Sequence, residues 1–216
     1  YYPVGGAGAI ARGIVPVIER AGGKVFVHAE VDAVIVERGK AVGVRMVDGQ
    51  ELRAPIVISD AGAVNTFNRL VPRQYVPADF SSALSALPPS TGHICVYLGY
   101  RKTAKELGFD GSNRWIFPNE DHDGNIERFS RDPEADIPMA YVSFPSAKDP
   151  AFLDRFPGRA TVEVVALTPY AWFGEWQDAR WRRRGEAYEA FKARFAERLM
   201  SFVATTLPNL RDQVDV

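Results

Sequence analysis

Residues 1–37 read YYPVGGAGAIARGIVPVIERAGGKVFVHAEVDAVIVE, and the order of residue types in this stretch decides the fold. A cluster of glycines precedes four apolar residues at near-helical spacing, which are Ile10, Ile14, Val17 and Ile18. The glycines at residues 22–23 end this pattern, and a β-branched run follows. The stretch therefore predicts a helix over residues 7–21 and then strands. Pro16 should kink or break that helix, because proline lacks an N–H and clashes with the preceding turn.

One interpretation of the glycine cluster is a dinucleotide-binding fingerprint. Gly6, Gly8 and Ala11 fit the pattern G-x-G-x-x-A, and Glu30 lies about where a ribose-binding acid is expected. Glycines let the backbone approach a pyrophosphate, and a helix N-terminus offers N–H groups and a partial positive charge. On this interpretation the protein is an NAD(P)-binding dehydrogenase.

The surroundings of this fingerprint do not match a nucleotide-binding unit well. Such a unit needs an apolar parallel strand before the glycines, and here only residues 1–4 precede them. Pro3 also lacks the N–H that a central strand would use. Residues 31–59 indicate successive short strands instead of a return to another helix. The dehydrogenase therefore stays as an alternative.

A second interpretation rests on a family resemblance carried by five segments. They are YPVGG at residues 2–6, HAEVDAV at 28–34, GVR at 43–45, DGQELRA at 48–54 and ISDAG at 58–62. Together with the intervening helix, these segments resemble the middle of flavoproteins of the phytoene desaturase, carotenoid isomerase and retinol saturase family. The resemblance is dense over residues 1–72 and diffuse afterwards. It implies an FAD-dependent oxidoreductase that transfers hydride between FAD and a carbon–carbon bond of an apolar, carotenoid- or retinoid-like substrate.

The resemblance also implies roles for individual residues. The backbone of Val31 would touch the adenine of FAD, and Ala61 and Gly62 would lie near the dinucleotide part of the cofactor. Gly5 and Gly6 would lie on the flavin side of the substrate cavity. The family's amino-terminal G-x-G-x-x-G unit and its carboxy-terminal flavin-contacting segment are absent from the 216 residues. The chain is therefore expected to be an interior fragment that is inactive alone and does not retain FAD.

Composition narrows the class of protein. Hydrophobic residues make up 46% of the chain, and 26 basic residues nearly balance 27 acidic ones, as in ordinary globular domains. This balance argues against broad nucleic-acid binding. Cys95 is the only cysteine, which excludes an internal disulfide and a cysteine-based metal site and favours the cytoplasm. No run approaches the roughly 20 apolar residues of a membrane span, so any membrane contact would be peripheral and made by the full-length protein.

The pattern of strands and turns predicts an α+β fold with two parts. In the first part, strands are expected over residues 24–28, 31–37, 41–47, 51–53 and 56–59. Arg38-Gly39 and Asp48-Gly49 suit hairpin turns, so residues 31–53 should form a β-meander. Asp60 is a plausible cap for the helix that follows. With its flanking helix, this part would be the remnant of an FAD-binding domain.

The second part should be a substrate domain with an antiparallel sheet. Prolines crowd residues 72–90, which predicts a connector with one short helix and a boundary near residue 75, hence domains 1–75 and 76–216. Strands are expected over residues 93–100, 115–118, 139–145 and 161–168, separated by loops. The polar residues 119–125 predict a solvated hairpin tip, because they lack the full spacing of a calcium loop and His122 has no second histidine at ligand spacing. A long helix is expected over residues 179–206, because apolar residues from Trp181 to Val203 recur there at three- and four-residue steps.

Residues 169–176 read PYAWFGEW and concentrate aromatic surface after a strand. These side chains would either line a cavity for an apolar substrate or anchor a loop to the core. A third functional alternative follows, in which the protein is a non-enzymatic module that binds a lipid or a partner through this surface. No nucleophile–base pair emerges from the sequence, and a flavoenzyme needs none, since the cofactor carries the hydride chemistry. Desaturation, saturation and isomerisation, and any oligomeric state, stay open.

Overall fold

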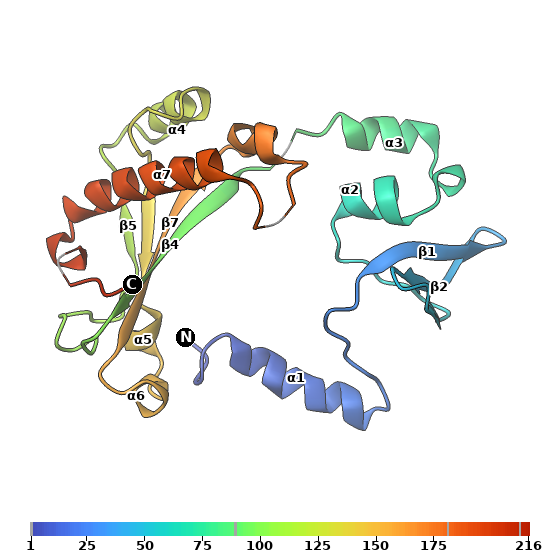
Figure 1. Cartoon of the computed structure of the whole chain (residues 1–216), viewed down its shortest axis with the longest axis horizontal. Helices are drawn as coiled ribbons and strands as arrows, with labels where there is room; N and C mark the ends of the chain where they lie inside the picture. The colour runs from blue at the N-terminus through green and yellow to red at the C-terminus, as the bar shows by residue number, and fades with distance from the viewer. Residues whose placement is uncertain (1, 89, 181, 212) are drawn as a thin grey trace. The chain divides into compact units, whose positions relative to one another are not determined.

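A computed structural model describes residues 2–88, 90–180, 182–211 and 213–216. Its contacts divide the chain into two compact units, one made of residues 1–16 and 89–216 and the other of residues 17–88. The fold is α+β, with one antiparallel sheet in each unit (Figure 1). The expected boundary near residue 75 stays a prediction about the domains of the whole protein.

The helix that follows the glycine cluster is α1 (Gly8–Arg20), within one residue of its predicted bounds. The helix continues through Pro16, so of the predicted kink or break the break does not occur, and the division between the two units falls inside the helix. No residue of α1 is buried, and its apolar stripe is exposed at Ile10, Ile14 and Val17.

The unit of residues 17–88 contains the predicted β-meander. Its three strands are β1 (Val31–Glu37), β2 (Lys40–Met46) and β3 (Glu51–Arg53), which pair antiparallel in that order. Arg38 and Gly39 both have positive φ, 51° and 75°, as the tight turn between β1 and β2 requires. The hairpin predicted from these two residues is confirmed.

Two segments of this unit that were predicted as strands are not strands. Residues 24–28 and 56–59 carry no strand assignment, and within them Val27 is 78% exposed and Ile58 90% exposed. A single β-branched run leaves its backbone N–H and C=O groups unpaired. The described chain places no neighbouring strand against either run, so neither forms a ladder.

Helical turns complete the unit: α2 (Ala63–Asn65), the π-turn η1 (Thr66–Leu70), the 3₁₀ turn η2 (Arg73–Tyr75) and α3 (Ala78–Ser85). The N-cap of α2 is Gly62, with φ 82° and no side-chain hydrogen bond. The prediction that Asp60 caps this helix is therefore wrong, because the chain turns into the helix two residues later than expected.

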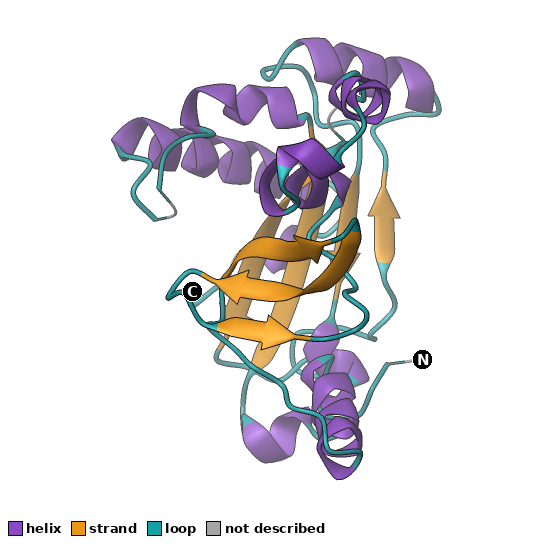
Figure 2. Ribbon diagram, turned by 90° about the vertical axis from the view of Figure 1, so that its right-hand side faces the viewer, coloured by secondary structure: helices purple, strands orange, loops and turns teal. Residues whose placement is uncertain are grey.

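The other unit is built on a four-stranded antiparallel sheet with the order β4-β7-β6-β5. The strands of the chain are drawn in orange in Figure 2. The strands are β4 (Gly92–Tyr100), β5 (Arg114–Ile116), β6 (Ala140–Ser143) and β7 (Ala160–Thr168). β4 and β7 pair over their full lengths, from Gly92 opposite Thr168 to Tyr100 opposite Ala160. The predicted antiparallel sheet is thus present, with strand bounds close to those expected.

One face of this sheet carries the core of the unit. Every second residue of β7 is buried, as expected for a strand with one covered face. The long helix α7 (Glu186–Ala204) covers that face, and its buried residues Phe195, Leu199 and Val203 join the strand side chains in one cluster (Figure 1). The short helices α5 (Pro145–Lys148) and α6 (Phe152–Arg155) connect β6 to β7.

The long C-terminal helix begins later than the periodicity predicted. Gly185, with φ 84°, is the N-cap of α7, so the helix starts at Glu186 and not near residue 179. Trp181, which the periodicity assigned to the helix, lies outside the described residues. Segment 170–176 forms the 3₁₀ turns of η3 (Tyr170–Trp176), and Pro208–Leu210 forms a further short turn, η4.

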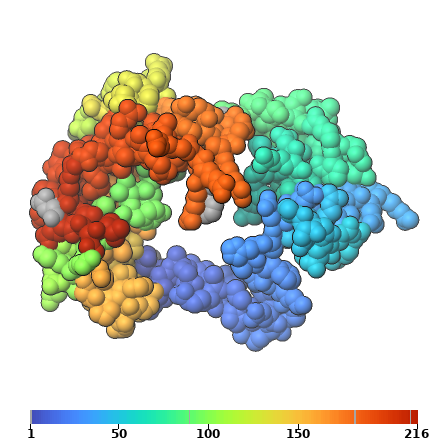
Figure 3. Space-filling view, in the orientation of Figure 1, coloured from blue at the N-terminus to red at the C-terminus, as the bar shows by residue number. Residues whose placement is uncertain are grey.

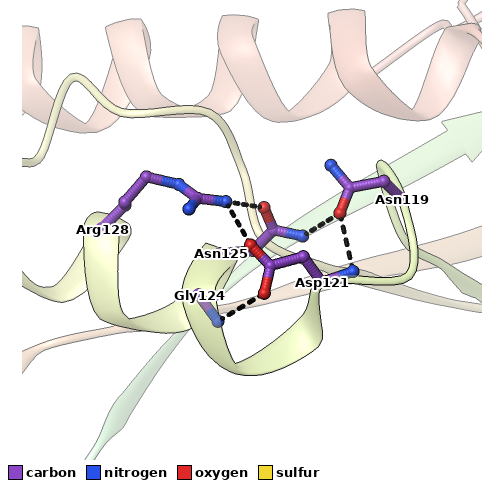
Figure 4. A network of polar contacts seen from close by, with 5 residues as sticks. All are labelled: Asn119, Asp121, Gly124, Asn125 and Arg128. Atoms are coloured by element: carbon purple, nitrogen blue, oxygen red, sulfur yellow. Dashed lines mark hydrogen bonds and ion pairs between the residues drawn. The ribbon is translucent and has the colours of Figure 1, made fainter.

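The predicted hairpin tip at residues 119–125 is a helix start instead. Helix α4 (His122–Arg131) begins after Asp121, whose carboxylate accepts a hydrogen bond from the N–H of Gly124 at 3.1 Å (Figure 4). The side-chain oxygen of Asn119 accepts from the Asn125 amide at 2.9 Å, and Arg128 donates to both Asp121 and Asn125. The polar residues satisfy the first turn of a helix, which explains their density.

Candidate functional site

Gly5 and Gly6, the residues expected on the flavin side of the substrate cavity, form a tight turn before α1. Their φ angles are 88° and 76°, and the N–H of Gly6 donates to the carbonyl of Pro3 at 3.0 Å. Positive φ is costly for residues with a Cβ, so the turn requires glycine at both positions.

A buried carboxylate ties this turn to the segment that connects β6 and β7 of the four-stranded sheet. Asp149 follows α5, its side chain is 2% exposed, and its Oδ1 accepts hydrogen bonds from the N–H groups of Gly5 at 2.9 Å and Ala151 at 3.0 Å. Arg155 donates to the other oxygen, Oδ2. The Gly5 N–H is the main cause that lowers the pKa of Asp149, and the Ala151 N–H and the Arg155 guanidinium lower it further.

A polar hollow of about 680 Å³ lies beside Asp149 and is lined by Lys148 and Tyr2. The Lys148 ammonium donates to the Ser143 hydroxyl at 2.9 Å and to Asn113, and it lies 5.8 Å from the centre of the Tyr2 ring. Burial lowers the pKa of Lys148, and burial also raises the pKa of Tyr2. Gly5 and Gly6 follow Tyr2 closely in the sequence, but they do not line this hollow.

The geometry around the turn disfavours the dinucleotide fingerprint. The N–H of Gly5 is already bound by a carboxylate, and the Arg12 guanidinium donates to the Gly5 carbonyl at 3.0 Å. A Cβ placed on Gly8 would lie 3.1 Å from Arg12 Nη1, so the same side chain covers that glycine. Residues 2–7 also form no strand. A pyrophosphate at this position would meet the negative charge of Asp149 instead of unpaired N–H groups.

The residues expected to contact FAD lie in the other unit, around a hollow of about 450 Å³. Gly62 lines this hollow, and a Cβ placed on it would meet no heavy atom within 4 Å. Val31 begins β1 opposite Met46, and the carbonyl of Ala61 accepts from the Asn65 amide at 2.9 Å. Val31 and Ala61 do not line the hollow, so the structure brings only Gly62 to it.

The chemistry of this hollow suits one part of a dinucleotide. Val34, Val57 and Phe67 form apolar walls, and the hydroxyls of Ser59 and Thr66 hydrogen-bond to each other at 2.7 Å on its polar side. Asp60 adds a carboxylate, whereas no lysine or arginine of the described residues lines the hollow. Apolar walls with a few polar groups fit an adenine and its ribose, while a pyrophosphate would need the missing positive charge.

Sequence reasoning missed Lys148, which lines the polar hollow, and Asp149, which binds the Gly5 N–H. Both lie between predicted strands in a segment with no recognisable motif, and only the folded sheet brings Asp149 to Gly5 and Lys148 to Tyr2. Among the described residues, no group of three or more His, Cys, Asp or Glu side chains could hold a metal ion. The same part of the chain contains no helix whose length and hydropathy suit a membrane crossing.

Comparison with known proteins finds relatives that are named as enzymes of retinoids and carotenoids. No protein-family model matches the chain. It is 38% identical to the human all-trans-retinol 13,14-reductase, over all of this chain and 37% of the reductase. It is 31% identical to a phytoene desaturase of Rhodobacter capsulatus, over 94% of this chain and 38% of the desaturase. Identity to the prolycopene isomerase of Daucus carota is 33% over 46% of this chain and 16% of the isomerase.

Solved structures share the fold. An oxidoreductase from Methanosarcina mazei superposes with a TM-score of 0.63 at 19% identity, over 99% of this chain and 42% of that protein. A Pyrococcus furiosus protein gives a TM-score of 0.56 at 18% identity. The chain thus spans well under half the length of the proteins it matches. These findings confirm the family resemblance of residues 2–62, and the chain belongs to the family of the retinol 13,14-reductases, phytoene desaturases and carotenoid isomerases.

Proposed function

We propose that the whole protein is an FAD-dependent oxidoreductase that acts by hydride transfer on a carbon–carbon bond of an apolar, retinoid- or carotenoid-like substrate. The observation that carries the proposal is the 38% identity to a retinol 13,14-reductase along the entire chain. The relatives that reduce retinol and desaturate phytoene, by their names, both change the hydrogen content of a conjugated chain. The apolar small molecule is the partner in this proposal, and a cytoplasmic enzyme could draw it from a membrane surface by peripheral contact.

Val31, Ala61 and Gly62 would hold the adenosine end of the cofactor. The open space at Gly62 and the apolar walls of the hollow support this assignment for Gly62, while for Val31 and Ala61 it rests on the family resemblance. When bound, the flavin supplies the hydride chemistry, while the protein binds and orients the substrate. The pyrophosphate would be held by residues other than those that line this hollow, since no basic side chain of the described residues lies among them.

Residues 1–75 would belong to the cofactor domain and residues 76–216 to the substrate domain. The exposed runs at residues 24–28 and 56–59 support the first assignment, because both have the composition of buried strands without a partner strand. In the whole protein these runs would join an FAD-binding sheet completed by other segments. The chain alone would therefore lack a finished cofactor site and be inactive.

Lys148 would hold the proton that accompanies hydride transfer. Adding two hydrogens to a double bond takes one hydride and one proton, and removing them releases the same pair. The Lys148 ammonium lines the polar hollow with a lowered pKa, which makes it a better proton donor than an exposed lysine. Gly5 and Gly6 would hold the neighbouring backbone turn in place at the substrate cavity.

Spectroscopy of the whole protein tests the proposal. The purified protein should be yellow, with flavin absorbance at about 450 nm. Adding all-trans-retinol to the reduced enzyme without oxygen should restore this absorbance and give a product with a shorter conjugated system, measured by chromatography. Residues 1–216 alone should be colourless and inactive. A colourless whole protein that binds no added FAD would refute the proposal.

The two alternatives predict different results. An NAD(P)-binding dehydrogenase would bind NADH saturably, which the carboxylate at Gly5 argues against. A lipid- or partner-binding module would bind retinoid without any flavin. Its proposed aromatic surface is largely engaged within the unit, since Phe173 lies 5.5 Å from Phe191 and Trp176 lies 5.3 Å from Tyr188 between ring centres. In Figure 3 the orange segment of residues 170–176 lies against the start of α7. The flavoenzyme therefore remains the better-supported function.

A further inference from the structure

A third hollow, of about 250 Å³, lies where β4 begins and β7 ends. Gly92 and Thr168, which face each other in the ladder, line it from the sheet. Aromatic side chains of η3 and α7 line it from the other side, among them Trp176 and Tyr188. None of these residues lines the hollow at Lys148, so the two hollows are different sites.

Thr168 gives this hollow an unusual polar group. The residue is 1% exposed, and its hydroxyl is the one buried side-chain oxygen or nitrogen of the described residues without a hydrogen-bond partner. Buried hydroxyls are nearly always paired, because an unpaired one loses its bonds to water and gains nothing. A Cβ on Gly92 would lie 3.5 Å from this oxygen, so the absence of a side chain at residue 92 leaves space beside it. The hydroxyl therefore suits a ligand that enters this space.

Arg184 places a positive charge at the same hollow. The residue is half-buried, and its guanidinium donates to the Tyr188 hydroxyl at 3.2 Å and lies 5.0 Å from the centre of the Tyr188 ring. Within the described ranges, no carboxylate forms an ion pair with it, and no acidic side chain lines the hollow. Arginine in such a setting is well matched to a carboxylate, which it can bind through two parallel hydrogen bonds.

We propose that this hollow binds the carboxylate of an apolar monocarboxylic acid, such as a long-chain fatty acid. Arg184 compensates the negative charge, the Thr168 hydroxyl donates to one carboxylate oxygen, and the aromatic walls cover the first carbons of the chain. An alcohol of the same length could engage Thr168 but would leave the guanidinium charge unmatched. The site therefore selects acids over alcohols, and it goes beyond the oxidoreductase activity proposed above.

Calorimetric titration of the whole protein with laurate, 1-dodecanol and acetate tests the proposal, with laurate below its micelle-forming concentration. Laurate should bind saturably, with at least about tenfold higher affinity than 1-dodecanol, because a charge-assisted bond replaces a neutral one. Acetate should not bind detectably, since it reaches none of the aromatic surface. Arg184→Leu should weaken laurate about tenfold or more and leave 1-dodecanol unchanged. Arg194→Leu is the matched control, because Arg194 is an exposed cation of α7 that does not line the hollow.

A second variant separates a binding role from a structural one. Thr168→Val keeps the shape of the side chain and removes the unpaired hydroxyl, so the Tm of the ligand-free protein should stay the same or rise. The affinity for laurate should still fall by about tenfold or more, the loss expected for one hydrogen bond from a neutral hydroxyl to a charged carboxylate. Equal binding of laurate and 1-dodecanol, an unchanged affinity in Arg184→Leu, or no saturable binding of laurate at all would each overturn the proposal.

Discussion

The buried carboxylate of Asp149 accepts a hydrogen bond from the backbone N–H of Gly5 across 144 positions of the chain. This bond fixes the glycine turn to the unit that contains the four-stranded sheet, and it lowers the pKa of Asp149. A carboxyl group whose pKa is lower in the folded than in the unfolded chain stabilises the fold at pH values above its unfolded pKa of about 4. The stabilisation is lost as the pH falls through the folded pKa.

Asp149→Asn should therefore lower the Tm by several degrees at pH 7 and flatten the loss of stability at acid pH. The amide cannot carry the charge that the Gly5 N–H and the Arg155 guanidinium stabilise. Thermal melts of the whole protein between pH 3 and pH 7 measure both effects. Asp154→Asn, at an exposed position of α6, is the control and should leave the curve unchanged. If the Tm of Asp149→Asn and of the unmodified protein fell by the same amount between pH 7 and pH 3, the result would contradict this account.

Lys148→Met should lower kcat by about a hundredfold, the usual range for loss of a positioned proton donor, with the flavin content unchanged. The donor is the protonated ammonium, so the rate should fall as the pH rises through the lowered pKa of Lys148. In Lys148→Arg this fall should move to higher pH, because a guanidinium keeps its proton. Steady-state rates across the pH range measure the shift, with Lys102→Met, at an exposed position, as control. An identical pH profile in all variants would exclude Lys148 from proton transfer.

Gly62→Ala should lower the FAD content of the purified whole protein at least tenfold, because a methyl group would enter the space assigned to the adenosine. Gly49→Ala is a closely matched control. Both glycines have positive φ, 82° and 88°, and neither has a heavy atom within 4 Å of an added Cβ. Each substitution should thus cost about 1 kcal/mol of backbone strain. Absorbance ratios and thermal melts compare the two, and equal flavin loss in both variants would attribute the effect to folding alone.

Ile58→Asp should destabilise the whole protein by about 2 kcal/mol or more and leave residues 1–216 alone almost unaffected. Ile58 is 90% exposed in this chain, whereas in a completed FAD-binding sheet its side chain would be buried. Denaturant unfolding of both forms measures the difference, and Ile58→Val should be mild in each. If Ile58→Asp had the same effect in both forms, residues 56–59 would not be a buried strand of a larger sheet.

The parts of the fold that sequence predicts well are those decided by neighbours in the chain. The predicted bounds of strands β1 and β3 match the observed ones, because the β-branched run and the Arg38-Gly39 and Asp48-Gly49 turns are local signals. Asp121 marks the limit of such reasoning. The same polar residues suit a loop and a helix cap, so α4 was predicted as a hairpin tip. Gly185 likewise sets the start of α7, whereas the apolar periodicity alone places the start of this helix near residue 179.

The candidate site depends on contacts that no local pattern records. Gly5 could be selected from the sequence, because two adjacent glycines before a helix require an explanation. Its partner Asp149 could not, since the pairing arises only when α5 packs beside β7. Thr168 looks like an ordinary strand residue, and its unpaired hydroxyl becomes visible only when the Gly92 pairing is known.

The unit with the four-stranded sheet is made of two separate stretches, residues 1–16 and 89–216, and this affects the order in which its contacts form during synthesis. Residues 2–16 are synthesised early, yet Gly5 acquires its partner only after Asp149 has been made. The hairpin of β1 and β2 closes over a few residues and can form at once, whereas the pairing of β4 with β7 must wait for residue 168. Until Asp149 has been made, the glycine turn at Gly5 has no carboxylate anchor, so a chain that stops before residue 149 cannot fix this turn.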